Sequence, residues 1–189
     1  MKVLVIKSSH RKQSNSALLA DKIAAGATEA GADVQIEDIG KLVINNCRGC
    51  YSCMLPTNKD FCAIKDDMQR FYKPVVEADA IVFAGPIYWF NICGQLKQFI
   101  DRCFAAAVIL GEDGKSIFAH KKIAAATAYE DVDPMKSGCV NMIRMFQDMC
   151  HYTGAAWAGA AYGTANAQGE MAANEKALAE AFELGKSLV

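Results

Sequence analysis

Short apolar runs alternate along this chain with longer segments in which apolar residues recur at helical spacing. This alternation is typical of a parallel sheet whose strands are joined by crossover helices. The runs that have the length of strands are residues 3–6, 34–39, 80–84, 123–127 and 156–162. We therefore predict an α/β fold, a doubly wound sheet with five parallel strands.

The segments between these runs have the period of amphipathic helices. Apolar residues recur on one face in three of them, at Leu19, Ile23, Ala27 and Ala30, at Ile143, Phe146 and Cys150, and at Leu178, Phe182 and Leu188. Asp66 followed three residues later by Gln69 resembles a capping box, which predicts a helix from residue 67 toward residue 78. Another helix is expected through residues 95–102.

Length and charge limit the classes of function. A chain of 189 residues suits one domain, residues 1–189, with a substantial core. Twenty basic and twenty-one acidic residues with no long run of either sign remove the usual electrostatic case for nucleic acid or an anionic membrane. The apolar start is too short for a signal peptide, and no stretch reaches about 20 apolar residues. We expect a cytoplasmic protein with a small-molecule ligand.

Four cysteines, Cys47, Cys50, Cys53 and Cys62, follow the spacing C-x2-C-x2-C-x8-C. The overlapping spacings can bring three thiolates around one tight turn, as the ligands of an iron–sulfur cluster require. Structural zinc fits less well, because zinc ribbons usually offer two separate C-x2-C pairs. The alternative without a metal is a group of reduced or redox-active cysteines in an apolar loop. Cys93, Cys103, Cys139 and Cys150 lie in helix-like segments and are expected in the core.

A polar loop follows the first predicted strand and precedes the first predicted helix. It holds Ser8, Ser9, His10, Arg11, Ser14, Asn15 and Ser16. A helix N-terminus offers unpaired N–H groups, the hydroxyls can donate further bonds, and Arg11 can neutralise a dianion. We interpret the loop as a phosphate site, although a polar surface loop with Asn15 as a helix cap has the same composition. It contains no glycine, which disfavours a dinucleotide fingerprint or a P-loop.

An aromatic loop follows the third predicted strand. Pro86, Ile87, Tyr88, Trp89 and Phe90 can provide a stiff turn and flat apolar walls for a large ring. In a doubly wound sheet of order 2-1-3-4-5, the first and third strands flank the switch point where ligands bind. The phosphate loop and the aromatic loop should therefore converge, and the fourth strand delivers Thr127 and Tyr129 to the same rim. At least one of the three consecutive aromatic residues should be exposed.

Taken together, the loop at 8–16, the cysteine segment ending at 62–68 and the motif at 85–97 resemble the NADPH-dependent FMN reductase family of flavodoxin-like proteins. The iron–sulfur flavoprotein branch of that family is the most similar. The resemblance implies an FMN phosphate bound at Ser9, Arg11, Ser14, Asn15 and Ser16, and a flavin ring beside Pro86, Ile87, Tyr88 and Trp89. It also implies a homodimer or homotetramer, in which a neighbouring chain often completes the flavin site.

Two departures from that family are visible. Its first loop commonly carries Gly-Ser-Pro-Arg, whereas this chain has Ser8-Ser9-His10-Arg11 and so keeps the serine and the arginine. The gap of eight residues before Cys62 is longer than is typical of the cluster-binding branch. Because this loop follows the second strand, we expect the four cysteines, and any [4Fe–4S] cluster they hold, beside the phosphate loop.

These features predict an oxidoreductase that passes electrons from NAD(P)H through bound FMN to a flavin, a quinone or another acceptor, including a redox protein. The main alternative is an iron–sulfur flavoprotein that carries electrons between ferredoxin-type donors and acceptors without NAD(P)H. The net charge of −1 gives little electrostatic steering toward basic partner proteins. A thiol-based sensor without flavin would leave the phosphate loop unexplained.

Overall fold

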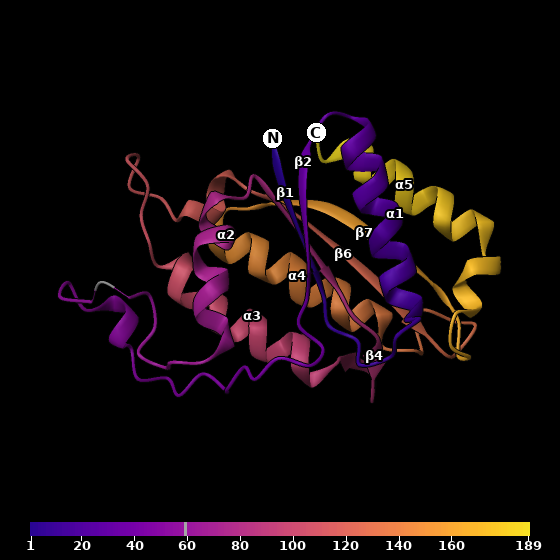
Figure 1. The fold of residues 1–189 in the computed structure, drawn as a ribbon, viewed down its shortest axis with the longest axis horizontal. Coiled ribbons are helices and arrows are strands. Elements are labelled where there is room, and N and C mark those ends of the chain that lie inside the picture. The colour runs from indigo at the N-terminus through magenta and orange to yellow at the C-terminus, as the bar shows by residue number, and fades with distance from the viewer. Residues whose placement is uncertain (59) are drawn as a thin grey trace.

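The computed structural model describes residues 1–58 and 60–189. Its centre is a sheet of five parallel strands in the order β2-β1-β3-β6-β7 (Figure 1). The strands are β1 (Lys2–Lys7), β2 (Asp33–Asp38), β3 (Ala80–Ala84), β6 (Lys122–Tyr129) and β7 (Ala156–Thr164). Each of the five predicted strands is confirmed within a few residues. The order confirms the predicted doubly wound topology.

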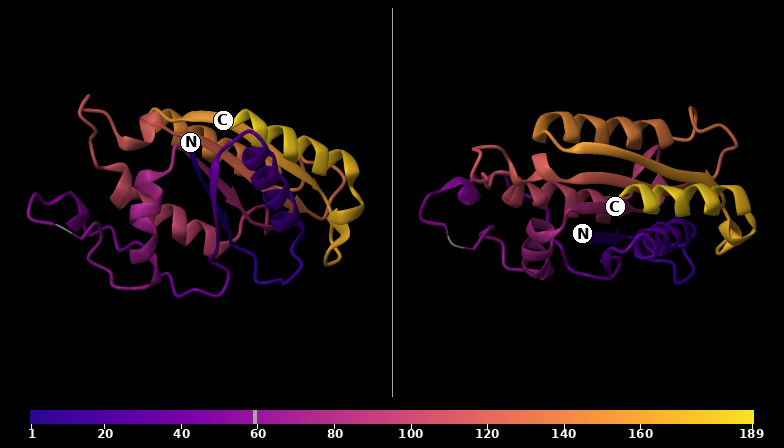
Figure 2. Two further views of the ribbon diagram at one scale, coloured as in Figure 1. Left: turned by 45° about the horizontal axis from the view of Figure 1, so that its top comes forward. Right: turned by 90° about the horizontal axis from the view of Figure 1, so that it is seen from above.

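Helices cover both faces of this sheet (Figure 2). They are α1 (Asn15–Glu29), α2 (Tyr72–Glu77), α3 (Gly94–Ala107), α4 (Cys139–Thr153) and α5 (Glu175–Ser187). The helices α1 and α5 pack on the face that carries Val3 and Val5, whereas α2, α3 and α4 pack on the face that carries Leu4 and Ile6. Because neighbouring residues of a buried strand point to opposite faces, each strand contributes to two cores. None of the helices in the described part of the chain is long and apolar enough to cross a membrane.

The helix predicted from residue 67 toward residue 78 is divided. A 3₁₀ turn (Asp67–Phe71) precedes α2. A continuous α-helix would place Pro74 in its interior, where the ring clashes with the carbonyl four residues earlier. Asp66 caps the turn by accepting from the Met68 N–H at 3.1 Å, as expected. The reciprocal bond of a capping box, in which the Gln69 side chain accepts from the Asp66 N–H, is not among the described contacts. The Gln69 amide donates to the carbonyl groups of Cys62 and Ile64.

Two glycines allow the backbones of α1 and α5 to touch. A Cβ atom on Gly26 of α1 would overlap the carbonyl oxygen of Phe182 on α5, and a Cβ atom on Gly185 of α5 would overlap the carbonyl oxygen of Ile23 on α1. The close approach is therefore reciprocal. Backbone atoms cannot move aside as a flexible side chain can, so any larger residue has to push the two helices apart.

We expect Gly26→Ala and Gly185→Ala each to lower the free energy of unfolding by about 1–3 kcal/mol, because the added methyl group overpacks this contact. Gly94→Ala is the matched control, since Gly94 also lies in a helix but has open space around its Cβ position. That variant should be neutral or slightly more stable. Urea unfolding measures all three, and equal stability of the three variants would contradict the close contact.

Candidate functional site

A cavity of about 190 Å³ opens at the carboxyl ends of β1, β3 and β6. Its walls come from the loop after β1, the loop after β3, the end of β6 and the loop after β7. The lining residues are Ser9, Arg11, Ser14, Asn15, Ser16, Pro86, Ile87, Tyr88, Ala128, Tyr129, Glu130, Ala165 and Asn166. The fold thus brings the predicted phosphate loop and the predicted aromatic loop together.

One end of this cavity is built from hydroxyl groups at the start of α1. Ser9, Ser14 and Ser16 are all buried, and the hydroxyls of Ser14 and Ser16 lie 3.0 Å apart. Ser14 precedes the helix, but its side chain does not cap the helix N–H groups. Free N–H groups and the positive end of the helix dipole make such a terminus suitable for an anion. The donor set therefore fits a phosphate group.

The loop after β7 closes this end of the cavity, and sequence reasoning did not identify it. The Arg11 guanidinium donates to the Asn166 carbonyl at 2.9 Å. The Asn15 amide donates to the Ala167 carbonyl at 2.8 Å and accepts from the Met171 N–H at 3.1 Å. Both polar atoms of the Asn15 side chain are thus used to hold the loop. Asn15 is not the helix cap, since Ser14 precedes the helix. Its amide keeps a second N–H and lines the cavity.

The opposite end of the cavity is apolar and aromatic. Pro86, Ile87 and Tyr88 lie on one side and Tyr129 on the other. Burial raises the pKa of Tyr129, which keeps its hydroxyl protonated and able to donate. A second, more open cavity of about 490 Å³ adjoins the first and shares Ile87, Tyr129 and Glu130 with it. Trp89 and Phe90 line this second cavity.

Two predicted site residues lie elsewhere. Thr127 is fully buried, and its hydroxyl donates to the Gly85 carbonyl at 2.8 Å. His10 is exposed and is not among the described residues that line either cavity. Glu130 was expected at this rim but was not among the predicted cofactor ligands, although it lines both cavities and accepts from the Asn166 amide at 3.1 Å. Its position directly after Tyr129 at the carboxyl end of β6 is the signal that could have identified it.

The cysteine loop runs away from this cavity, so the expectation that it lies beside the phosphate loop is wrong. The cysteines line a separate pocket with the second half of α3 and the last turn of α4. Because α3 starts at the carboxyl edge of the sheet and runs back toward the amino edge, this pocket is at the opposite end of the molecule. Figure 1 shows the loop projecting far from the β4 label, which marks the strand β4 (Ile87–Tyr88) at the first cavity.

Three polar side chains of α3 hold the cysteine loop along the helix. Gln95 donates to the carbonyl groups of Ile39 and Leu42, and Gln98 donates to the Asn46 side chain at 2.8 Å. Arg102 donates to the carbonyl of Asn45 at 2.9 Å. Spacings of three and four residues place Gln95, Gln98 and Arg102 on one face of the helix. This face determines the direction of the loop, which is why the position of β2 alone did not predict it.

Arg102 also forms a buried ion pair at the base of the loop. Its guanidinium contacts both carboxylate oxygens of Asp66, at 2.7 and 3.1 Å, and both side chains are almost fully buried. Burial alone would raise the pKa of Asp66, but hydrogen bonds from Arg102 and Asn45 outweigh it and hold that pKa below its ordinary value. The carboxylate is therefore ionised at neutral pH.

Two buried donors beside this pair have no hydrogen-bond partner among the described residues. They are Nε of Arg102 and the hydroxyl of Tyr72. Both groups neighbour Cys62, and burial raises the pKa of Tyr72. A buried donor without an acceptor is costly. Arg102 lines the cysteine pocket, so its Nε–H is the donor that the pocket wall can offer to an electron-rich atom.

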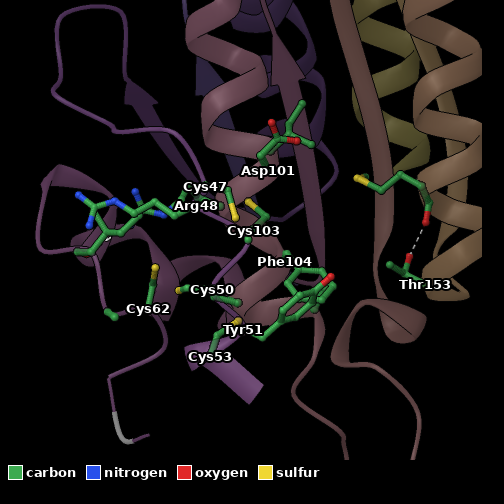
Figure 3. Close-up of a pocket in the computed structure, with 18 of the residues that line it drawn as sticks. Cys47, Arg48, Cys50, Tyr51, Cys53, Cys62, Asp101, Cys103, Phe104 and Thr153 are labelled. Carbon is green, nitrogen blue, oxygen red and sulfur yellow. Dashed lines mark hydrogen bonds between the residues drawn. The ribbon is translucent and has the colours of Figure 1, made fainter. Parts of the chain in front are cut away.

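The four cysteines line one side of a pocket of about 410 Å³ (Figure 3). Cys47 and Cys50 are exposed, and Cys53 and Cys62 are half-buried. The Ser52 hydroxyl lies 3.3 Å from the Cys50 sulfur and lowers the pKa of that thiol. No group of three or more metal-ligating side chains converges in the part of the chain that the structure describes. The thiols share one pocket without forming a closed ligand set.

The other four cysteines are buried in the core, as predicted. They are Cys93, Cys103, Cys139 and Cys150.

Comparison with known proteins shows which family and which solved structures this chain is similar to. The model of the NADPH-dependent FMN reductase family matches residues 1–171. An iron–sulfur flavoprotein of Archaeoglobus fulgidus is 35% identical over 102 residues, which are 54% of this chain and 45% of that protein. The chain spans about half the length of several such iron–sulfur flavoproteins. A putative NAD(P)H-dependent FMN-containing oxidoreductase of Bacillus subtilis, YwqN, is 26% identical over 98% of this chain and 97% of its own length.

Solved structures with the same fold include the NAD(P)H:quinone oxidoreductase from Methanothermobacter marburgensis. It superposes with a TM-score of 0.74 over 100% of this chain and 99% of its own, at 18% identity. At this level of identity the similarity establishes the fold.

We expect Arg102→Met to lower the free energy of unfolding by about 3–5 kcal/mol at pH 7, because it leaves the Asp66 carboxylate buried without its partner. In the wild-type protein the folded-state pKa of Asp66 is lowered. The pair therefore stabilises the fold at pH values above about 3.9, the pKa of an aspartate in the unfolded chain. Its contribution is lost as the pH falls through the pKa of Asp66 in the folded protein. The cost of the substitution should thus shrink below about pH 4.

Gln98→Ala is the control for this experiment, since it removes one exposed bond from the same helix face. It should cost no more than about 1.5 kcal/mol, with little dependence on pH. Urea unfolding at pH 7 and again well below pH 4, under the folded-state pKa of Asp66, separates the two variants. A pH-independent cost of Arg102→Met would contradict the role given to the ion pair.

Proposed function

Because the chain belongs to the NADPH-dependent FMN reductase family, we propose that it is an oxidoreductase that binds FMN in the cavity between the β1 and β3 loops. In this proposal it passes electrons from NAD(P)H to a flavin, a quinone or another acceptor. The observation that carries the proposal is the convergence of a hydroxyl-lined helix terminus and an aromatic wall in one cavity. A phosphate monoester joined to a flat ring has matching chemistry at its two ends.

At the phosphate end, Ser9, Ser14 and Ser16 supply hydroxyl donors, and the first turn of α1 supplies N–H groups. Arg11 adds a positive charge, which is held at the rim by its bond to the loop after β7. The Asn15 side chain fixes that loop and keeps one amide N–H for the phosphate. The absence of a glycine-rich dinucleotide fingerprint in the sequence favours FMN over FAD.

At the ring end, Pro86, Ile87, Tyr88 and Tyr129 provide the contacts. Bound FMN supplies the hydride and electron chemistry of the reaction. The residues of the chain bind and orient the ring, and the adjoining cavity leaves room for a second planar ring beside it. No side-chain nucleophile is required. Donor and acceptor would use this space in turn, which predicts ping-pong kinetics.

The remaining predictions extend this proposal. We propose that residues 1–189 form one FMN-binding domain, since both cores pack on the same sheet. The homodimer or homotetramer, the cytoplasmic location and the identity of the acceptor stay predictions.

A second candidate function concerns the cysteine pocket. We propose that Cys47, Cys50, Cys53 and Cys62 hold an iron–sulfur cluster, with Arg102 and Tyr72 behind it. Four thiols around one pocket and two buried donors without acceptors beside Cys62 support this candidate. The four thiols have to move toward one another to form a ligand set. A cluster would supply one-electron transfer, as the alternative carrier function requires.

We expect FMN, not FAD, in flavin extracted from the purified protein and identified by mass. Arg11→Ala should weaken FMN binding by about 1.5–3 kcal/mol, because it removes a charge-assisted bond to the phosphate. Lys12→Ala is the matched control, since Lys12 is an adjacent exposed cation that does not line the cavity. Flavin fluorescence titration gives both affinities. Equal affinities of the two variants would remove Arg11 from the site.

We expect NADH or NADPH to bleach the bound flavin without air, because the adjoining cavity gives the nicotinamide access to the ring. Anaerobic stopped-flow absorbance measures the rate and identifies the preferred nucleotide. Bleaching by reduced ferredoxin and by neither nucleotide would favour the electron-carrier alternative.

We expect protein purified or reconstituted without air to contain iron and acid-labile sulfide in a ratio close to one, if the cluster proposal is right. A variant with serine at Cys47, Cys50 and Cys53 should lose both and keep FMN, since these residues lie outside the flavin cavity. Protein that stays free of iron after reconstitution leaves the cysteines as thiols, and the FMN-dependent reductase remains the function.

A further inference from the structure

A strained two-residue turn carries an exposed tryptophan that lines the cavity beside the flavin cavity. The short strands β4 and β5 (Asn91–Ile92) form an antiparallel hairpin in which Trp89 and Phe90 are the turn. Their φ angles are 47° and 66°, in the left-handed region. Two-residue turns of this kind normally contain asparagine and glycine, because bulky residues adopt positive φ only at a cost in free energy. The surrounding structure must hold the turn in place.

The start of α4 provides that support. The Asn141 amide donates to the Phe90 carbonyl at 2.9 Å. Gly138, just before the helix, lies against the Phe90 backbone so closely that a Cβ atom at this position would overlap it. These contacts fix the carbonyl of the second turn residue, and so they fix the peptide geometry on which the left-handed conformation depends.

The supported turn forms one wall of the cavity beside the flavin site. Trp89 is 93% exposed and Phe90 is 56% exposed, and both line the cavity of about 490 Å³ that shares Ile87 and Tyr129 with the flavin cavity. Together the two adjacent side chains form an exposed apolar patch, which is a more informative feature than a single exposed residue. A flat aromatic wall beside the flavin site suits a planar aromatic or quinonoid ring.

We propose that the Trp89–Phe90 turn is a fixed wall for the planar ring of the second substrate, and that Asn141 is the positioning residue that holds it. The inference rests on the proposed function, because it identifies the part of the site that the hydride donor and the acceptor would contact. Asn141 acts through the backbone of the turn and touches neither FMN nor the substrate. Removal of the Asn141 side chain changes the position of Trp89, without changing the residues around the FMN phosphate.

The test compares Asn141→Ala and Asn141→Asp, which both lose the amide donor, with Arg144→Ala as the control. Arg144 is an exposed residue one turn further along α4, and its guanidinium pairs with Asp148, away from the turn. All variants also carry Trp157→Phe, so that Trp89 is the single tryptophan. Trp157 stacks on Phe146, and phenylalanine keeps that contact. The readouts are Trp89 fluorescence anisotropy, the affinity for FMN, and the NAD(P)H concentration that gives half-maximal bleaching of the flavin.

We expect both Asn141 variants to lower the anisotropy of Trp89 and to raise the half-saturating NAD(P)H concentration about 3- to 10-fold, the effect of one lost hydrogen bond. The affinity for FMN and the maximal bleaching rate should stay at the values of the Arg144→Ala control. Unchanged anisotropy in the Asn141 variants would overturn the positioning role. Lower anisotropy with an unchanged half-saturating concentration would overturn the role of the turn as a substrate wall.

Failure of the proposed function is distinguishable from failure of this inference. If NAD(P)H does not bleach the flavin of the parent protein, the reductase proposal fails. The role of the turn is then tested with a quinone that reoxidises chemically reduced flavin. In the Asn141 variants, the half-saturating concentration of the quinone should rise by the same factor. An unchanged half-saturating concentration of the quinone would overturn the role of the turn as a substrate wall.

Discussion

The parallel pairing of β1 with β3 is the constraint on which the candidate site depends. Lys7 pairs with Ala84 at the carboxyl ends of these strands, so the loops that begin at Ser8 and Gly85 start side by side. The Ser8 hydroxyl and N–H both donate to the Ala84 carbonyl, which extends the contact past the end of the sheet. The pairing of the two strands therefore brings the hydroxyl groups of one loop to the aromatic groups of the other.

A second arrangement, along α3, separates the two candidate redox sites. This helix begins beside the flavin cavity and ends at the cysteine pocket, and its 14 residues span roughly 20 Å. Gln95, Gln98 and Arg102 hold the cysteine loop along its length, and the buried pair of Arg102 with Asp66 fixes the end of that loop. Within one chain the two sites thus lie at opposite ends of a rigid element. The two sites of one chain are therefore too far apart to touch. Electron exchange between them requires transfer through the protein over that distance, or transfer to a site on a neighbouring chain.

The sequence predicted the features that depend on strand order and failed where tertiary contacts decide. Apolar runs identified five strands, and the order of those strands places Ser9, Arg11, Tyr88 and Tyr129 around one cavity. The role of Asn15 was not predictable, because its partners in the loop after β7 lie more than 150 residues away. The path of the cysteine loop was missed for a similar reason. Its anchors are polar residues of α3, which look in the sequence like an ordinary solvated helix face.

Backbone strain in the described residues gathers at the two candidate sites. The non-glycine residues with positive φ are Tyr51 and Phe61 in the cysteine loop, and Trp89 and Phe90 in the hairpin. All four are aromatic, the residue type least suited to relieve the strain by itself. Glycine or asparagine at these positions would ease folding but would remove a flat apolar surface. Tyr51 and Trp89 each line a cavity, and Phe61 stacks on the buried Tyr72 at the base of the cysteine loop. At Tyr51, Trp89 and Phe90 the strained backbone thus places aromatic surface on a cavity wall, whereas at Phe61 it places the ring against the buried Tyr72.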